Sequence, residues 1–126
     1  MNTTAKAHAG YYDASKQARV TEANAHELIS ILFDELANLL DEIAFLVKRD
    51  KGNAIRDQEA LALSIIDSLI ISLDMQRGGP LASNLKANYT RMRWLLTSSD
   101  ATNRLTNILA ASQIVFEIRD AWKKIG

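Results

Sequence analysis

The sequence predicts an all-α protein, an antiparallel up-down four-helix bundle with an N-terminal extension. Three observations lead to this fold class. Apolar residues after position 24 recur at the three- and four-residue spacing of amphipathic helices. No segment shows the alternation of apolar and polar residues that is typical of a half-buried strand. The periodic segments are joined by short polar connections, which place consecutive helices antiparallel.

The first expected helix covers residues 24–49, with Asn24 as its candidate N-cap. It closes at the segment KRDKGN, where basic residues suit the helix C-terminus and Gly52 breaks the helix. Its apolar stripe consists of Leu28, Ile29, Leu32, Leu36, Leu39, Leu40, Ile43, Leu46 and Val47. The second expected helix covers residues 54–76, and its inward side consists of Glu59, Ala62, Leu63, Ile66, Leu69, Ile70 and Leu73.

The segment QRGGP is expected to separate the second helix from the third. Gly78 and Gly79 would end the second helix, because glycine tolerates the left-handed conformation found at helix ends. Pro80 would lie in the first turn of a third helix over residues 80–98, with Leu81, Ala82, Leu85, Tyr89, Met92 and Leu96 inward. The fourth helix would start at Asp100 or Ala101, with the stripe Leu105, Ile108, Leu109, Ser112, Val115, Phe116, Arg119 and Trp122.

The length of 126 residues suits a single domain. We expect residues 1–23 to be a partly flexible N-terminal extension and residues 24–126 to form the bundle. Fifteen basic and fifteen acidic side chains cancel, which argues against a nucleic-acid partner. The chain has no cysteine, no secretory signal and no apolar run long enough for membrane insertion, which predicts a cytoplasmic protein.

The residues that could carry chemistry are few and poorly arranged for it. His8 and His26 lie far apart in the sequence, and no Glu-x-x-His pair of the di-metal bundle type is present. Asp34 and Asp41 point away from the apolar stripe, whereas acid–base catalysis requires a carboxyl group in a desolvated cleft. The sequence therefore predicts no enzyme activity, no cofactor and no metal.

The helices carry more large apolar side chains than one core stripe accounts for. The surplus side chains are Ile31 and Phe45 in the first helix, Leu61 and Ile65 in the second, and Trp94 in the third. Grooves between such helices could receive a partner's amphipathic helix, or Tyr11 and Tyr12 of the extension could fold over them. The alternative is a bundle whose helices each touch several neighbours, with a few exposed apolar residues of no consequence. A second apolar stripe on the fourth helix fits either interpretation; it consists of Ala111, Ile114, Ile118 and Ile125.

Three blocks of the sequence resemble the flagellar secretion chaperone family FliS. The first is SLDMQRGGPLASNLKANYTRMRWLL, where the family pattern falls on Leu73, Asp74, Gly78, Gly79, Ala82, Asn84, Leu85, Tyr89 and Met92. AHELISILFDELANLL is similar to the first long helix of the family, with Phe33 in register. FEIRDAWKKI is similar to its closing segment, with Arg119, Asp120, Ala121 and Trp122 in place.

The resemblance implies an export chaperone that binds the disordered C-terminal segment of flagellin and prevents its premature polymerisation. Combined with the surplus of apolar side chains, it suggests the partner-binding residues Tyr11, Tyr12, Ile31, Phe33, Phe45, Leu61, Ile65 and Trp94. Other flagellar export or regulatory proteins are further expected partners. The alternative function is a structural or regulatory bundle that self-associates as a homodimer through the same faces and has no flagellin client.

Overall fold

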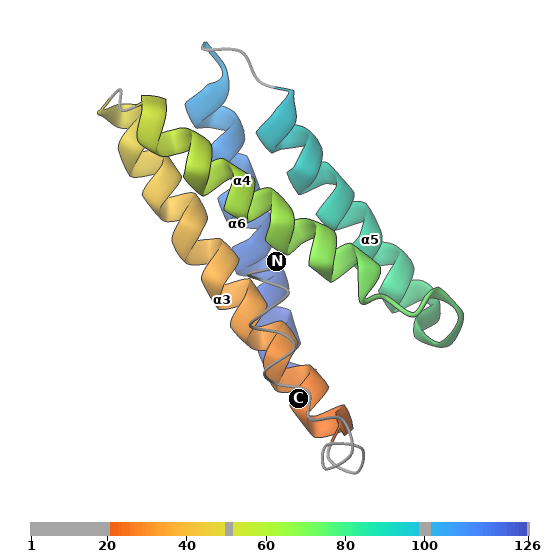
Figure 1. The fold of residues 1–126 in the computed structure, drawn as a ribbon. Coiled ribbons are helices and arrows are strands. Elements are labelled where there is room, and N and C mark those ends of the chain that lie inside the picture. The colour runs from red at the N-terminus through yellow and green to blue at the C-terminus, as the bar shows by residue number, and fades with distance from the viewer. Residues whose placement is uncertain (1–20, 50–51, 99–101, 126) are drawn as a thin grey trace.

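The computed structural model describes residues 21–49, 52–98 and 102–125, and these form four α-helices and no strand. The helices are α3 (Thr21–Lys48), α4 (Gly52–Ile71), α5 (Met75–Thr97) and α6 (Arg104–Ile125). Their direction alternates along the chain, as Figure 1 shows. The prediction of an all-α up-down bundle is thus confirmed. Tyr11, Tyr12 and the rest of the predicted extension up to residue 20 lie outside the described residues.

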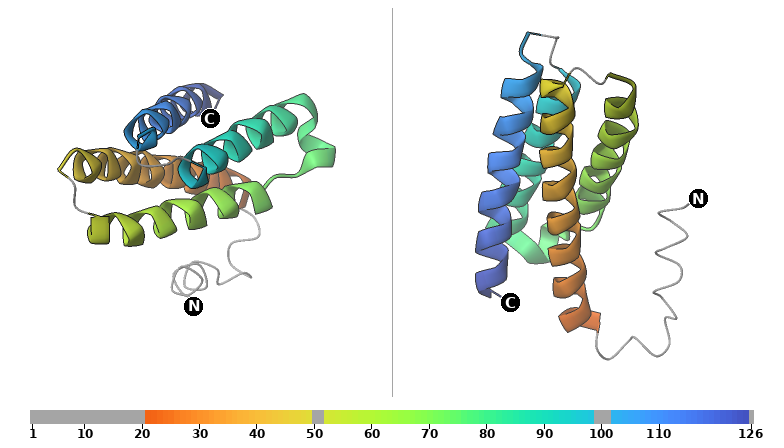
Figure 2. Two further views of the ribbon diagram at one scale, coloured as in Figure 1. Left: turned by 90° about the horizontal axis from the view of Figure 1, so that it is seen from above. Right: turned by 90° about the vertical axis from the view of Figure 1, so that its left-hand side faces the viewer.

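The four helices surround a common core. Each helix packs against the next one along the chain, and α6 packs back against α3 to close the ring (Figure 2). The largest fully buried side chains come from all four helices: Phe33, Leu36, Leu40, Ile43, Ile66, Leu69, Tyr89, Met92, Ile108 and Val115. None of the helices in the described ranges is both long and apolar enough to span a lipid bilayer.

The connection between α4 and α5 differs from the sequence prediction. Helix α4 ends at Ile71, well before the glycine pair, and Asp74 caps a new helix by accepting hydrogen bonds from the N–H groups of Gln76 (3.2 Å) and Arg77 (3.1 Å). The glycines follow the first turn of α5, and the backbone of Gly79 is non-helical. The prediction that the glycine pair ends the second helix is therefore wrong, because an aspartate cap starts the third helix before it.

The other helix ends also shift by a few residues. Helix α3 begins at Thr21, so Asn24 lies inside it and is not its cap. Helix α6 begins at Arg104, later than the expected start at residue 100 or 101. These shifts leave the order and the direction of the helices unchanged.

The buried face of α6 is rotated relative to the predicted stripe. Leu109 and Phe116, expected inward, are 47% and 54% exposed, whereas Ala111 and Ile118 of the second stripe are buried. The cause is that α6 packs against both α3 and α5, so that its core face lies between the two stripes. Its polar positions face α3, where Ser112 donates a hydrogen bond to Asp41 and Arg119 pairs with Asp34.

Candidate partner-binding site

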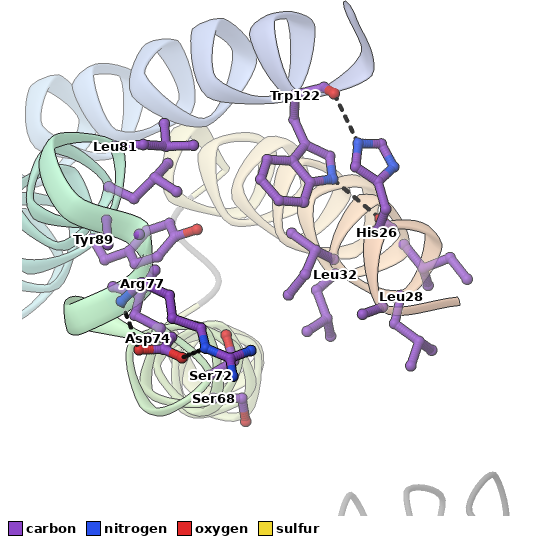
Figure 3. A pocket seen from close by; sticks show the side chains of 17 residues that line it. His26, Leu28, Leu32, Ser68, Ser72, Asp74, Arg77, Leu81, Tyr89 and Trp122 are labelled. Carbon is purple, nitrogen blue, oxygen red and sulfur yellow. Dashed lines mark hydrogen bonds and ion pairs between the residues drawn. The ribbon is translucent and has the colours of Figure 1, made fainter. Parts of the chain in front are cut away.

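A hollow of about 660 Å³ lies between the first turns of α3, the last turn of α4, the start of α5 and the end of α6 (Figure 3). We call this end of the bundle the open end. In Figure 1 the lower ends of α4 and α5 diverge from those of α3 and α6. The hollow is mainly apolar, and the aliphatic side chains that line it are Leu28, Ile29, Ile31, Leu32, Leu73, Leu81 and Leu85.

One wall of the hollow depends on the glycine pair of α5. Gly79 has a φ of 52°, in the left-handed region that costs a residue with a Cβ about 1–2 kcal/mol. A Cβ on Gly78 would lie 2.5 Å from the Cβ of Ala82, which is too close for two carbon atoms. These glycines allow a bend in the backbone, and the regular part of α5 begins after the bend, at Pro80. Leu81 then lines the hollow with 51% of its surface exposed, which explains why its predicted burial is wrong.

The opposite wall is built by His26 of α3 and Trp122 of α6. The Trp122 indole Nε1–H donates to the carbonyl oxygen of His26 (3.1 Å), and the His26 Nε2 lies 3.0 Å from the carbonyl oxygen of Trp122. A carbonyl can only accept, so this contact assigns the proton to Nε2. The two rings stack with centroids 4.6 Å apart. We call this pair the His26–Trp122 clasp, because it fixes the end of α6 against the start of α3.

Tyr89 of α5 lies at the floor of the hollow, and only 1% of its surface is exposed. Its ring packs against Phe33 with centroids 6.3 Å apart. Figure 3 shows its hydroxyl oxygen pointing into the hollow. Burial raises the pKa of this phenol above its ordinary value of 10.0 because the charged form would lose its hydration. The hydroxyl is therefore protonated at neutral pH.

Charged side chains of the lining lie at the exposed rim of the hollow. Asp74 and Arg77 form an exposed ion pair (3.8 Å) at one edge of the hollow. This pair contributes little to stability because it lies in water. Within the described ranges, no three His, Cys, Asp or Glu side chains come together as ligands for a metal ion. The arrangement is suited to burying apolar side chains of a partner.

The structure divides the predicted partner-binding residues into three groups. Ile31 lines the hollow and is 56% exposed. Phe45, Leu61 and Trp94 are exposed on the bundle surface outside the hollow, as their surplus positions suggested.

Phe33 and Ile65 belong to the core, with exposures of 0% and 7%. Phe33 is enclosed by the rings of Tyr89 and Trp122, and a partner would reach either residue only if the bundle opened. Tyr11 and Tyr12 lie outside the described residues.

Sequence reasoning missed His26, Arg77, Leu81 and Trp122 as parts of one site. Trp122 was placed in the core stripe, and His26 was considered only as a possible metal ligand. Their contact joins residues 96 positions apart in the sequence, and no local pattern can signal it. The only available signal was the resemblance of the closing segment, which contains Trp122, to a known family.

Comparison with known proteins assigns the chain to a family. Residues 7–126 match the family described as Flagellar protein FliS. The chain is 31% identical to the flagellar secretion chaperone FliS of Salmonella typhimurium, over 98% of this chain and 92% of that protein. It is 30% identical to the flagellar secretion chaperone FliSB of Pseudomonas aeruginosa, over 96% of each chain. These matches cover the four helices and the hollow, and the chain belongs to the FliS family.

Proposed function

We propose that this chain is a cytoplasmic flagellar secretion chaperone that binds the disordered C-terminal segment of flagellin. Binding would prevent premature polymerisation of flagellin and keep it competent for export. The observation that carries the proposal is the apolar hollow at the open end of the bundle, together with the name flagellar secretion chaperone of the relatives. The proposed activity is binding and involves no catalytic step.

The physical basis is folding coupled to binding. A disordered segment pays ordering entropy when it binds, and it must recover that cost by burying apolar surface. Ile31 and Leu81 offer this surface from opposite sides of the hollow, and both are about half exposed in the free chain. Burying one large side chain contributes roughly 1.5–3 kcal/mol, so a few such contacts offset the ordering of a short helix.

The exposed side chains outside the hollow provide additional contacts in this proposal. A segment that leaves the hollow and continues over the bundle would meet some of Phe45, Leu61 and Trp94. Tyr11 and Tyr12 are proposed to gate the binding groove. A second flagellar export or regulatory protein would use the surface that flagellin leaves free.

Self-association is the second candidate function. It is favoured by the same exposed apolar residues, since a monomer gains nothing by leaving Ile31, Phe45 and Trp94 in water. A homodimer through these faces would hide them without a client. The two functions predict different particle masses when the chain is mixed with flagellin.

The test uses the full chain and a synthetic peptide of the flagellin C-terminal segment. Titration calorimetry should give one peptide per chain, and circular dichroism should show a gain of helix beyond the sum of the components. Light scattering should give the mass of a one-to-one complex. A stable dimer that does not bind the peptide would instead support self-association and contradict the chaperone proposal.

A further inference from the structure

An exposed aromatic ring on the outer side of α3 is bordered by four exposed charges. Phe45 has 54% of its surface in water, on a side of α3 that neither α4 nor α6 covers (Figure 2). Asp41 and Glu42 precede it by about one turn, and Lys48 and Arg49 follow it by about one turn. Because residues three and four apart are neighbours on a helix, these five side chains form one surface. We call this surface the Phe45 patch.

The charges of the Phe45 patch have no opposite partner within the chain. No ion pair in the described ranges includes any of its four charged residues. Its carboxylates accept hydrogen bonds from neutral groups, Asp41 from the Ser112 hydroxyl (3.4 Å) and Glu42 from the Gln58 amide (3.3 Å). The Arg49 guanidinium lies over the aromatic ring, 4.6 Å from its centroid. Two negative and two positive charges thus remain available to a partner.

The order of these charges is self-complementary. The acids lie three and four residues before the ring, and the bases lie three and four residues after it. A two-fold rotation that reverses the helix direction therefore brings the bases of one copy opposite the acids of the other. The rotation preserves the side of the helix, and Asp41 shares a side with Lys48 as Glu42 does with Arg49, because each pair is seven residues apart.

We propose that two copies of this chain associate through the Phe45 patch, with their α3 helices antiparallel about a two-fold axis at Phe45. The two aromatic rings meet at the axis and bury each other. In each direction Asp41 of one copy pairs with Lys48 of the other, and Glu42 pairs with Arg49 of the other. A parallel arrangement would place acid against acid and base against base, so the charges select the antiparallel one.

This dimer goes beyond the proposed function and leaves the hollow free. Helix α3 ends at Lys48, so with the axis at Phe45 the helix of the second copy ends opposite Glu42. The lining of the hollow on α3 reaches only to Leu32, about 15 Å farther along the helix. Each copy therefore keeps its client site, unlike a self-association that replaces the client. One ring pair and exposed ion pairs form a small contact, so the dimer is weak and appears at high protein concentration.

The first arm of the test measures the particle mass by sedimentation equilibrium up to millimolar protein concentration. The unchanged chain should pass from one chain to two as the concentration rises. Glu42→Arg and Arg49→Glu each turn two attractions of the dimer into repulsions and should weaken it about tenfold or more. The matched control is Glu117→Arg, because Glu117 is also an exposed glutamate that accepts from a glutamine amide (2.9 Å), but it lies on α6. This control should dimerise like the unchanged chain.

The second arm mixes the two charge variants. In a pair made of one Glu42→Arg chain and one Arg49→Glu chain, residues 42 and 49 again carry opposite charges across the contact in both directions. The mixture should therefore form a heterodimer at concentrations where each variant alone is a monomer. Native mass spectrometry identifies the heterodimer by its mass. A mixture that stays monomeric where the unchanged chain dimerises would overturn the inference.

Three further results would also overturn it. One is an unchanged chain that remains monomeric at millimolar concentration, and another is a dimer that Glu42→Arg and Glu117→Arg affect equally. The third is a loss of affinity of Glu42→Arg for the flagellin C-terminal peptide at low concentration, because the patch would then belong to the client site. The proposed function fails by a different result, namely that the unchanged chain binds no peptide.

Discussion

The two ends of the bundle use the same kinds of residues with opposite results. At the closed end, where α3 ends and α4 begins, the apolar side chains Ile43, Ile55 and Ile108 are buried. At the open end, Leu28 and Leu32 continue the same stripe of α3, yet they are only half-buried and line a hollow. Identical periodicity in one helix thus produces a closed core at one end and the lining of a hollow at the other.

The difference arises from the neighbours of α3 and not from α3 itself. Helix α4 stops at Ile71, and the bend at Gly79 leads the start of α5 away from the bundle axis (Figure 1). Fewer atoms remain to cover the first turns of α3. The His26–Trp122 clasp keeps α6 against α3, so that the gap stays on one side. The hollow therefore arises because two helices diverge from a continuous apolar stripe.

The largest expected effect contrasts truncations at the two ends of the α3 stripe. Ile43→Ala should lower the free energy of unfolding by about 2–5 kcal/mol, because it leaves a cavity in a closed core. Leu32→Ala should lower it by only about 1–2 kcal/mol, because its side chain is already half in water. Urea unfolding monitored by circular dichroism measures both losses. Equal losses would mean that the open end is packed as tightly as the closed end in solution.

Client binding should show the reverse order. Ile31→Ser removes an exposed apolar wall of the hollow and should weaken flagellin-peptide binding about tenfold or more, with little change in melting temperature. Trp94→Ser, outside the hollow, should weaken binding by a smaller factor and again more than it lowers stability. Calorimetric titration compares the two. A large loss of thermal stability in Trp94→Ser with intact binding would remove Trp94 from the proposed contact surface.

Alkaline pH should destabilise the protein through Tyr89. Its pKa is raised by burial, so the unfolded phenol ionises above its ordinary pKa of 10.0 while the folded one keeps its proton. The stabilising contribution is complete below about pH 10 and is lost as the pH rises beyond it, by up to about 1.4 kcal/mol per pH unit. Unfolding of the unchanged chain and of Tyr89→Phe at about pH 9 and about pH 11 isolates this contribution. Parallel pH curves for the two proteins would rule it out.

The smallest expected effect concerns the His26–Trp122 clasp. Trp122→Phe removes the N–H donor to the His26 carbonyl but keeps an aromatic ring beside Phe33, and should cost about 1 kcal/mol. The loss should be local to the open end. Hydrogen exchange should therefore accelerate for amides of residues 25–32 and remain unchanged around Ile43. Uniform acceleration along α3 would show that the clasp supports the whole bundle.

Much of this fold could be predicted because amphipathic periodicity is a local property. The α3 stripe from Leu36 to Ile43 and the α5 stripe from Leu85 to Met92 are buried as their spacing indicates. The prediction was wrong for Leu109 and Phe116 of α6, because the positions of α3 and α5 decide which side of α6 is buried and the spacing within α6 fits two stripes. It was also wrong at the start of α5, where the short-range cap of Asp74 outweighs the preference of glycine for helix ends.

The sequence by itself determined the helices, their alternating direction and a surplus of apolar side chains, because each depends on residues within a few positions of one another. Only the tertiary structure decided which of the predicted partner-binding side chains lie at the surface. It buried Phe33 and Ile65, left Ile31 at the edge of a hollow, and joined His26 to Trp122 across 96 positions. The physical reason is that burial depends on the atoms contributed by other helices, and the divergence of α4 and α5 is visible in no single helix.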